Sequence, residues 1–288
     1  MKHLLERIHH YLGLVRFAHT VFALPFAIIA TLVAAGGLPD WWTLGWILFC
    51  MVTARTSAMS FNRIADLHYD RLNPRTRSRH LPAGMVSVGE AVGLWLLSSG
   101  LFVVGAAQLN SLTLALSPVA LLIIWAYSYM KRFTSLCHLV LGLSLAIAPI
   151  GAWVAITGEI GLPALVLGAG VLLWVTGFDI IYALLDEAFD REAGLHSMVV
   201  RLGRVNALRL SFALHLASVG FFWGFGYMTG LGWIYGLGVG AYAALIIYEH
   251  SLVRPDDVSQ VNTAFFTVNG VISIGLMVIC CLDVFLPL

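Results

Sequence analysis

Long, nearly unbroken runs of apolar residues dominate this chain, and short stretches rich in glycine, proline, asparagine and charge separate them. A membrane-spanning helix needs about 20 mostly apolar residues. The runs are continuously apolar rather than alternating, which predicts helices and excludes a membrane β-barrel. The pattern therefore predicts an all-α polytopic membrane protein that forms a single domain over residues 1–288. Nine segments approach the required length: 17–36, 42–62, 88–108, 112–130, 136–157, 162–185, 206–228, 231–250 and 263–286.

Composition agrees with this pattern. Of the 288 residues, 60% are hydrophobic and only 11% are charged, whereas a soluble domain carries about 25% charged residues. Too little charge remains to cover a water-facing surface, which excludes an ordinary soluble enzyme, a nucleic-acid-binding protein and a disordered chain. The net charge of +1 provides no overall field that would attract an acidic partner. Function must therefore be sought in where the few charges lie.

The basic residues alternate between the two sides of the predicted membrane. The connections after the second, fourth, sixth and eighth segments contain Lys and Arg, and those after the first, third, fifth and seventh contain none. Because positive loops stay in the cytoplasm, we expect a cytoplasmic N-terminus and an external C-terminus, in a membrane of the bacterial cytoplasmic (inner) type. Residues 1–20 are amphipathic and carry no cleavage site, so they are expected to form an interfacial helix.

Two similar acidic motifs follow the second and sixth segments. The first reads NRIADLHYDRLNPRTRSRHLPAG and the second FDIIYALLDEAFDREAGLHSMVVRLG, each with two acids four residues apart before a basic loop. We interpret this as an internal duplication, with two four-helix halves and a ninth helix added. Steps of three and four place residues on one face of a helix. The two stripes so predicted are Asn62, Asp66 and Asp70, and Asp179, Tyr182, Asp186 and Asp190.

These residue types indicate a chemistry. Carboxylate and amide oxygens suit Mg²⁺, which also bridges to substrate phosphates; no His and Cys set with transition-metal spacing accompanies them, which argues against zinc. Nearby cations can neutralise phosphate oxygens. The residues alone thus favour a Mg²⁺-dependent membrane enzyme that acts on a lipid diphosphate inside a helical bundle, with a secondary transporter as the alternative. The cations are Arg75, Arg79, Lys131 and Arg132.

At these motifs the chain resembles the UbiA superfamily of intramembrane prenyltransferases. The likeness rests on the N-x-x-x-D-x-x-x-D pattern that starts at Asn62 and the D-x-x-Y-x-x-x-D-x-x-x-D pattern that starts at Asp179, and it extends over nearly the whole chain. One departure is Arg63, which stands where many members have an Asp after the first Asn. The resemblance implies a central cavity, with Asp66 and Asp70 as the main acids of the first motif.

The resemblance also implies roles for individual residues. Asn62, Asp66, Asp70, Asp186 and Asp190 are expected to hold Mg²⁺ against a prenyl diphosphate. Contacts to the diphosphate are expected from Arg75, Arg79, Lys131 and Tyr127. The aromatic substrate is expected at Arg55, Tyr182 and Asp179, where Arg55 can clamp a carboxylate with two hydrogen bonds. The catalytic set is then Arg55, Asp66 and Asp179, with one of the two acids taking the ring proton.

The resemblance extends to particular branches of the family. The motif stretches look like the branch of the futalosine route of menaquinone synthesis, whose acceptor is a 1,4-dihydroxy-6-naphthoate, and the 4-hydroxybenzoate prenyltransferases of ubiquinone synthesis are close relatives. Branches that act on protohaem or chlorophyllide fit the second motif less well. The basic loop at residues 71–86 is expected to order over the diphosphate as a lid, since water must be excluded from an allylic cation.

Overall fold

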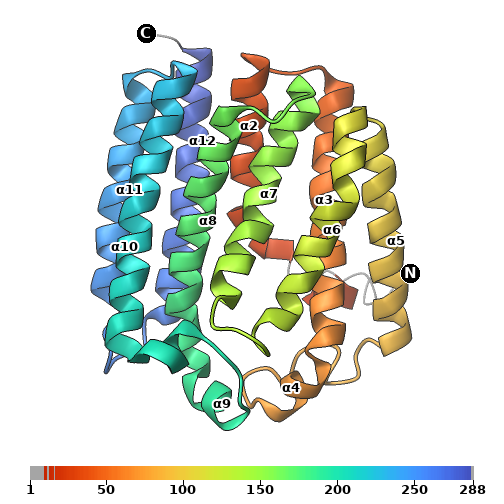
Figure 1. Ribbon diagram of the computed structural model, residues 1–288, viewed down its shortest axis with the longest axis vertical. Coiled ribbons are helices and arrows are strands. Elements are labelled where there is room, and N and C mark those ends of the chain that lie inside the picture. The colour runs from red at the N-terminus through yellow and green to blue at the C-terminus, as the bar shows by residue number, and fades with distance from the viewer. Residues whose placement is uncertain (1–9, 12, 16, 287–288) are drawn as a thin grey trace.

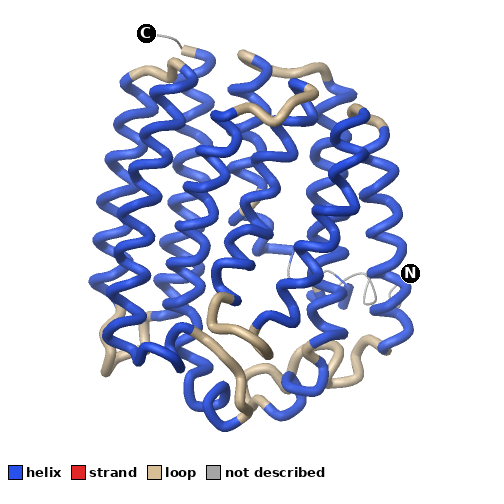
Figure 2. The backbone as a smooth tube through the Cα atoms, viewed as in Figure 1, coloured by secondary structure: helices blue, strands red, loops and turns tan. Residues whose placement is uncertain are grey.

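The computed structural model describes residues 10–11, 13–15 and 17–286, and this part of the chain is a bundle of long helices (Figures 1 and 2). The long helices are α3 (Trp41–Ala65), α5 (Val88–Ala107), α6 (Ser111–Met130), α7 (Cys137–Thr157), α8 (Leu162–Ala183), α10 (Met198–Thr229), α11 (Trp233–Leu252) and α12 (Asn269–Phe285). The shorter elements are the 3₁₀-helices η1 (Phe17–Phe22) and η2 (Leu184–Asp186), the helices α2 (Leu24–Ala35), α4 (Leu67–Leu72) and α9 (Glu187–Glu192), and the π-helix η3 (Thr263–Val268).

Each of the nine predicted apolar segments coincides with helical structure. Among the described residues, seven helices are long and apolar enough to cross a membrane, and a shorter apolar helix covers Thr20–Ala35. The all-helical prediction is thus confirmed, whereas nine crossings, two repeated halves and the membrane sides of the termini stay predictions. The interfacial helix expected at residues 1–20 falls largely outside the described residues.

The outer surface of the bundle is apolar. Leucines such as Leu97, Leu122 and Leu237 are each more than 60% exposed on the outward faces of α5, α6 and α11. Exposed leucine in such numbers would be costly in water, and it is what helices facing lipid require. The outward faces therefore support a bundle surrounded by a bilayer.

The core lies around α8, which packs between α7 and α10. Trp174 of α8 is buried against Phe26 of α2 and packs on Phe178, and Phe26 stacks on Phe222 of α10. Helices α7 and α8 approach very closely at Gly142, where a Cβ atom would lie 2.4 Å from the carbonyl oxygen of Leu172. Small residues at helix contacts allow such approaches in membranes, and this one brings the polar ends of α7 and α8 together.

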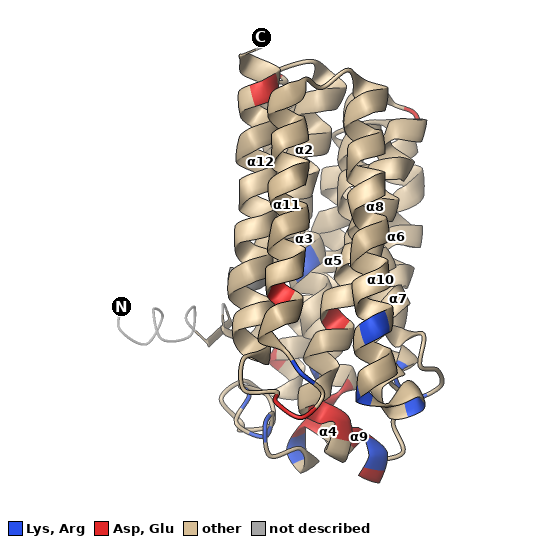
Figure 3. Ribbon diagram, turned by 90° about the vertical axis from the view of Figure 1, so that its left-hand side faces the viewer, with Lys and Arg blue, Asp and Glu red and all other residues tan. Residues whose placement is uncertain are grey.

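Both predicted acidic stripes cross a helix break. Helix α3 ends at Ala65, and Asp66 lies between α3 and the short α4. The second stripe passes from α8 through η2 into α9. Each stripe is therefore divided between two or more helical elements rather than carried by one continuous helix. The breaks bend the chain so that α4 and α9 lie side by side at one end of the bundle (Figures 1 and 3).

Helix α10 begins earlier than the apolar pattern predicts. The pattern predicts a seventh segment from residue 206, whereas α10 begins at Met198. The helix is interrupted at Gly203, whose φ of 73° and ψ of 162° are outside the helical range. Only glycine adopts this conformation readily, so the short first piece of α10, residues 198–202, is set off from the rest of the helix.

Charged residues gather at the end of the bundle that carries α4 and α9, and the C-terminal end of α12 lies at the opposite end (Figure 3). The connections at that opposite end hold no Lys or Arg. The alternation of basic loops in the sequence is therefore matched by a structural separation of the two ends.

Candidate functional site

One cavity of about 570 Å³ runs from the charged end into the bundle, between α3, α6, α7 and α8. Every residue that the sequence marked as a site residue lines it, together with apolar side chains deeper inside. Near the far end, Val119, Ile160 and Leu165 line the cavity and are also about half exposed on the outside, so the cavity reaches the lipid-facing surface. The marked residues are Arg55, Asn62, Asp66, Asp70, Arg75, Arg79, Tyr127, Lys131, Asp179, Tyr182, Asp186 and Asp190.

The first acidic motif stands where α3 gives way to α4. Asn62, in the last turn of α3, donates from Nδ2 to Oδ2 of Asp66 at 2.8 Å. Burial raises the pKa of Asp66 to about 6, and the neighbouring charge of Asp70 raises it further than Arg132, 3.6 Å away, can offset. Asp70 accepts two hydrogen bonds from Nη1 of Arg79, at 2.7 and 3.0 Å. The two acids thus face the cavity with different counter-ions.

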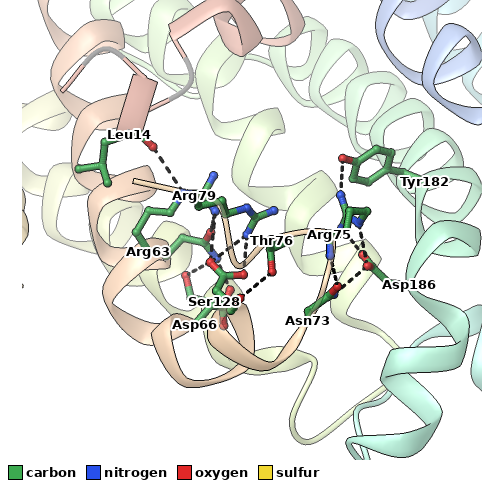
Figure 4. Close-up of polar contacts among 12 residues, drawn as sticks. Leu14, Arg63, Asp66, Asn73, Arg75, Thr76, Arg79, Ser128, Tyr182 and Asp186 are labelled. Atoms are coloured by element: carbon green, nitrogen blue, oxygen red, sulfur yellow. Dashed lines mark hydrogen bonds and ion pairs between the residues drawn. The ribbon is translucent and has the colours of Figure 1, made fainter. Parts of the chain in front are cut away.

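Arg63 takes a place in this motif that the sequence did not assign. Its side chain is buried, donates to Oδ1 of Asn62 at 3.3 Å and lies 4.0 Å from Asp70. It also donates from Nε to the carbonyl oxygen of Leu14 at 3.4 Å (Figure 4). Arg63 is therefore a cation built into the motif, which orients Asn62 and partly neutralises Asp70.

The second acidic motif meets the basic loop that follows the first. Arg75 donates from Nε to Oδ1 of Asp186 at 2.9 Å, a second guanidinium nitrogen pairs with Oδ2, and Asn73 donates to Oδ1 at 3.1 Å (Figure 4). Nη1 of Arg75 also donates to the hydroxyl of Tyr182 at 2.8 Å. One turn further on, Nζ of Lys131 lies 2.7 Å from Oδ2 of Asp190. The loop is thereby tied to Asp186, and the end of α6 is tied to Asp190.

Each acid of the two motifs has a cation of its own: Arg132 for Asp66, Arg79 for Asp70, Arg75 for Asp186 and Lys131 for Asp190. Burial would lower the pKa of Arg75 and of Lys131, but the adjacent carboxylates outweigh it and raise both. Both cations therefore stay charged at any physiological pH, and the site is close to neutral as it stands.

The acids fit a hard divalent cation in their chemistry. Within the described part of the chain, no three His, Cys, Asp or Glu side chains already converge as ligands. Yet Asp190 is 1% exposed, and apart from Lys131 no described group donates a hydrogen bond to either of its oxygens. Buried carboxylate oxygens with so few donors are incompletely satisfied, and a bound Mg²⁺ would satisfy them. Asn62, Asp66, Asp70, Asp186 and Asp190 are thus available to hold it.

The deeper part of the site holds the residues expected at the aromatic substrate. Arg55 lies on α3, two turns from Asn62, and Tyr127 on α6 lies within electrostatic range of both Asp179 and Asp66. Tyr182 stacks on Phe265 of η3, with ring centroids 4.1 Å apart. Tyr182 thereby links the apolar cavity wall to Arg75.

The structure adds residues that the sequence did not single out. Asn73 contacts Asp186, and Thr76 donates to the carbonyl oxygen of Asp70 at 3.2 Å, which fixes the basic loop. His138, at the start of α7, lies with Nδ1 2.7 Å from Oδ2 of Asp179. The Asn73-Pro74 turn was a usable signal for the loop residues, but a lone histidine beside an apolar run gave none for His138.

Comparison with known proteins gives a family. The sequence profile of the UbiA prenyltransferase family matches residues 23–271. A Vibrio parahaemolyticus protein named 4-hydroxybenzoate octaprenyltransferase is 33% identical over 257 residues, which cover 86% of this chain and 88% of that protein. A protein of the same name from Nitrosospira multiformis is 32% identical over 93% of both chains.

Solved structures agree in fold. A UbiA homolog from Aeropyrum pernix K1, solved in its apo form, is 36% identical with a TM-score of 0.82, covering 90% of this chain and 97% of that one. A UbiA homolog from Archaeoglobus fulgidus bound to DMAPP and Mg²⁺ is 19% identical, with a TM-score of 0.74 and coverage of 96% and 99%. At that identity the second likeness concerns the fold alone.

Proposed function

Because the chain belongs to the UbiA prenyltransferase family, we propose that it uses Mg²⁺ to transfer a polyprenyl group to a ring carbon of a hydroxylated aromatic carboxylic acid. The donor is a polyprenyl diphosphate and the reaction belongs to quinone synthesis. One observation carries the proposal: two acidic motifs and their cations line the polar end of a single cavity whose remainder is apolar. The polar end suits a diphosphate group, and the apolar remainder suits an isoprenoid chain.

The proposed ligands of Mg²⁺ are Asn62, Asp66, Asp70, Asp186 and Asp190. When bound, Mg²⁺ supplies positive charge that stabilises the departing diphosphate. The cations that now neutralise the acids, with the Tyr127 hydroxyl, would then contact phosphate oxygens. Binding is in this view an exchange of counter-ions, and the net charge of the site changes little. The cations concerned are Arg75, Arg79 and Lys131.

The proposed transfer breaks one bond, forms another and releases one proton, and residues of the cavity can serve each of these events. The C–O bond of the allylic diphosphate breaks with its electron pair leaving on the diphosphate, and the ring carbon ortho to a hydroxyl forms the new C–C bond. The proton on that carbon passes to a carboxylate, Asp179 or Asp66. Arg55 would hold the carboxylate of the aromatic acid, with Tyr182 beside the ring. The apolar wall of the cavity keeps water away from the allylic carbocation.

Two acceptors follow from the sequence stretches at the motifs, 1,4-dihydroxy-6-naphthoate and 4-hydroxybenzoate. Relatives named 4-hydroxybenzoate octaprenyltransferase support the second. Both are phenolic carboxylic acids, so Arg55 suits either. A secondary transporter, open from the sequence alone, gains no support, because the acidic motifs gather at one end of the bundle rather than at its middle (Figure 3).

The experiment that tests the proposal is a product assay with purified protein in detergent. A labelled geranylgeranyl or longer prenyl diphosphate is supplied with Mg²⁺ and, separately, 4-hydroxybenzoate or 1,4-dihydroxy-6-naphthoate. We expect one of them to give a prenylated acid and one equivalent of diphosphate. Prenylation of neither acid, while protohaem or chlorophyllide is prenylated under the same conditions, would place the chain in another branch.

A further inference from the structure

His138 and Asp179 form a buried hydrogen-bonded pair in the cavity wall, between α7 and α8. Nδ1 of His138 lies 2.7 Å from Oδ2 of Asp179, although the two residues are 41 positions apart. The His138 side chain is 3% exposed and that of Asp179 is 20% exposed. Both residues line the cavity. The carboxylate therefore stands at the cavity surface with the imidazole behind it.

The hydrogen bond at Nε2, the other ring nitrogen of His138, indicates which tautomer is present. Nε2 of His138 accepts a hydrogen bond from the backbone N–H of Met198, the first residue of α10, at 3.2 Å. A nitrogen that accepts this bond carries no proton, so the proton is on Nδ1 and is donated to Asp179. An imidazolium would put two donors against each other at Nε2, beside the positive end of the α10 helix dipole. Nδ1–H of His138 is thus held as the donor to Asp179.

The surroundings fix the imidazole rigidly. Ser197 caps α10 by accepting from the backbone N–H of Val200 at 3.1 Å, which leaves the Met198 N–H to His138. One turn along α7 from His138, Gly142 allows α7 to touch α8. The contact between α7 and α8 sets how far His138 reaches, so the direction of its Nδ1–H is determined by two helices rather than by its own rotamer.

We propose that His138 is a positioning residue for the proposed prenyl transfer: its Nδ1–H holds one oxygen of Asp179 and directs the carboxylate as the acceptor of the ring proton. Oδ1 of Asp179 accepts no hydrogen bond from the described part of the chain, and it is the oxygen available for that proton. His138 itself neither gains nor loses a proton. This inference rests on the proposed function and selects Asp179 over Asp66 as the base.

Two near-isosteric substitutions separate the two hydrogen bonds of His138. In His138→Asn the amide nitrogen can replace Nδ1 and still donate to Asp179, but nothing reaches Met198. In His138→Gln the amide oxygen can replace Nε2 and still accept from Met198, but the donor to Asp179 is lost. A role through Asp179 predicts that Asn preserves kcat and Gln lowers it about 10- to 100-fold, as expected for impaired general-base catalysis. A role in helix capping predicts the reverse order.

The decisive readout is a primary deuterium isotope effect, measured with 4-hydroxybenzoate deuterated ortho to the hydroxyl, or with the dihydroxynaphthoate deuterated ortho to its hydroxyls if the wild type uses that acid. In His138→Gln removal of the ring proton becomes slow, so the isotope effect on kcat rises above that of the wild type while the KM for the prenyl diphosphate is unchanged. The double variant His138→Gln/Asp179→Asn should be no slower than Asp179→Asn alone. His196→Gln, an exposed histidine in the neighbouring loop, is the matched control.

The outcomes divide cleanly. An unchanged isotope effect in both His138 variants, or a greater loss in His138→Asn than in His138→Gln, overturns the inference. If His138→Gln does not fold, as judged by thermal unfolding in detergent, His138→Leu, which removes both hydrogen bonds, takes its place: its kcat must fall and its isotope effect must rise, while His138→Asn retains the wild-type values. Failure of the wild type to prenylate any aromatic acid refutes the proposed function as well, whereas a normal wild type with unaffected variants refutes only the role of His138.

Discussion

Arg75 reaches across the cavity to Asp186, donating from Nε to Oδ1 at 2.9 Å, and so joins the loop that follows the first acidic motif to the second motif (Figure 4). The loop is therefore anchored over the polar end of the cavity before any substrate binds. Four such acid–cation pairs neutralise the site, and substrate binding is expected to redistribute them rather than to bring new charge together.

Hydrogen exchange of residues 71–86 tests whether this loop acts as a lid. Adding Mg²⁺ with a non-hydrolysable prenyl diphosphate would give Arg75 and Arg79 phosphate partners. We expect slower exchange of the backbone amides in this loop. The loop at residues 253–262, which lies at the same end of the bundle, should not change. Unchanged protection of residues 71–86 would argue against the lid.

Lys131→Met tests the exchange of counter-ions. Lys131 neutralises Asp190 at 2.7 Å, and it is proposed to contact the diphosphate during the reaction. Its loss should raise the KM for the prenyl diphosphate about tenfold or more, the scale of one strong charge-assisted hydrogen bond, with little effect on the KM for the aromatic acid. Arg254→Ala removes an exposed cation at the same end and should change neither constant. Equal effects of the two substitutions would contradict the assignment.

The pKa of Asp66 predicts a pH dependence. Burial and the nearby Asp70 raise this pKa to about 6, so the carboxyl group becomes neutral as the pH falls through that value. Only the ionised form binds Mg²⁺ well. The Mg²⁺ concentration that gives half-maximal activity should therefore rise steeply below about pH 6 and level off above about pH 7. Asp66→Asn should bind Mg²⁺ weakly and flatten this profile, and a wild-type profile without a break near pH 6 would be evidence against Asp66 as a ligand.

Arg55→Ala tests the proposed carboxylate clamp. A bidentate Arg–carboxylate contact should contribute a factor of about 10 to 100 to binding. The KM for the aromatic acid should rise by that factor, and the KM for the prenyl diphosphate should not. The variant should also discriminate less between the acid and the corresponding phenol without a carboxylate. Undiminished discrimination would place the carboxylate elsewhere in the cavity.

Much of the site could be predicted from the sequence because it depends on spacing. Residues at steps of three and four share a face within one helix, and each motif keeps helical or near-helical backbone on both sides of its break. The motif from Asn62 to Asp70 therefore faces the cavity as expected, even though α3 ends at Ala65. Arg75 and Arg79 also followed from the pattern, since the basic loop directly follows the first pair of acids in the chain.

Other features depend on packing between distant helices and left no local signal. His138 meets Asp179 because Gly142 lets α7 approach α8, and nothing in the apolar run around His138 indicates that contact. The interruption of α10 depends on the conformation of one glycine, Gly203. In the sequence, Arg63 is only a departure from the expected acidic pattern. The structure shows that its buried side chain contacts Asn62 and Asp70 and so belongs to the motif.

The central claim is that the two acidic motifs act together through Mg²⁺ on a prenyl diphosphate. It is tested most directly by the rate of formation of prenylated aromatic acid in wild-type protein, in wild-type protein with excess EDTA, and in Asp66→Ala/Asp186→Ala. We predict activity that EDTA abolishes and that Mg²⁺ restores in the wild type but not in the double variant. Product formation that persists in EDTA, or that survives the double substitution, would contradict the account.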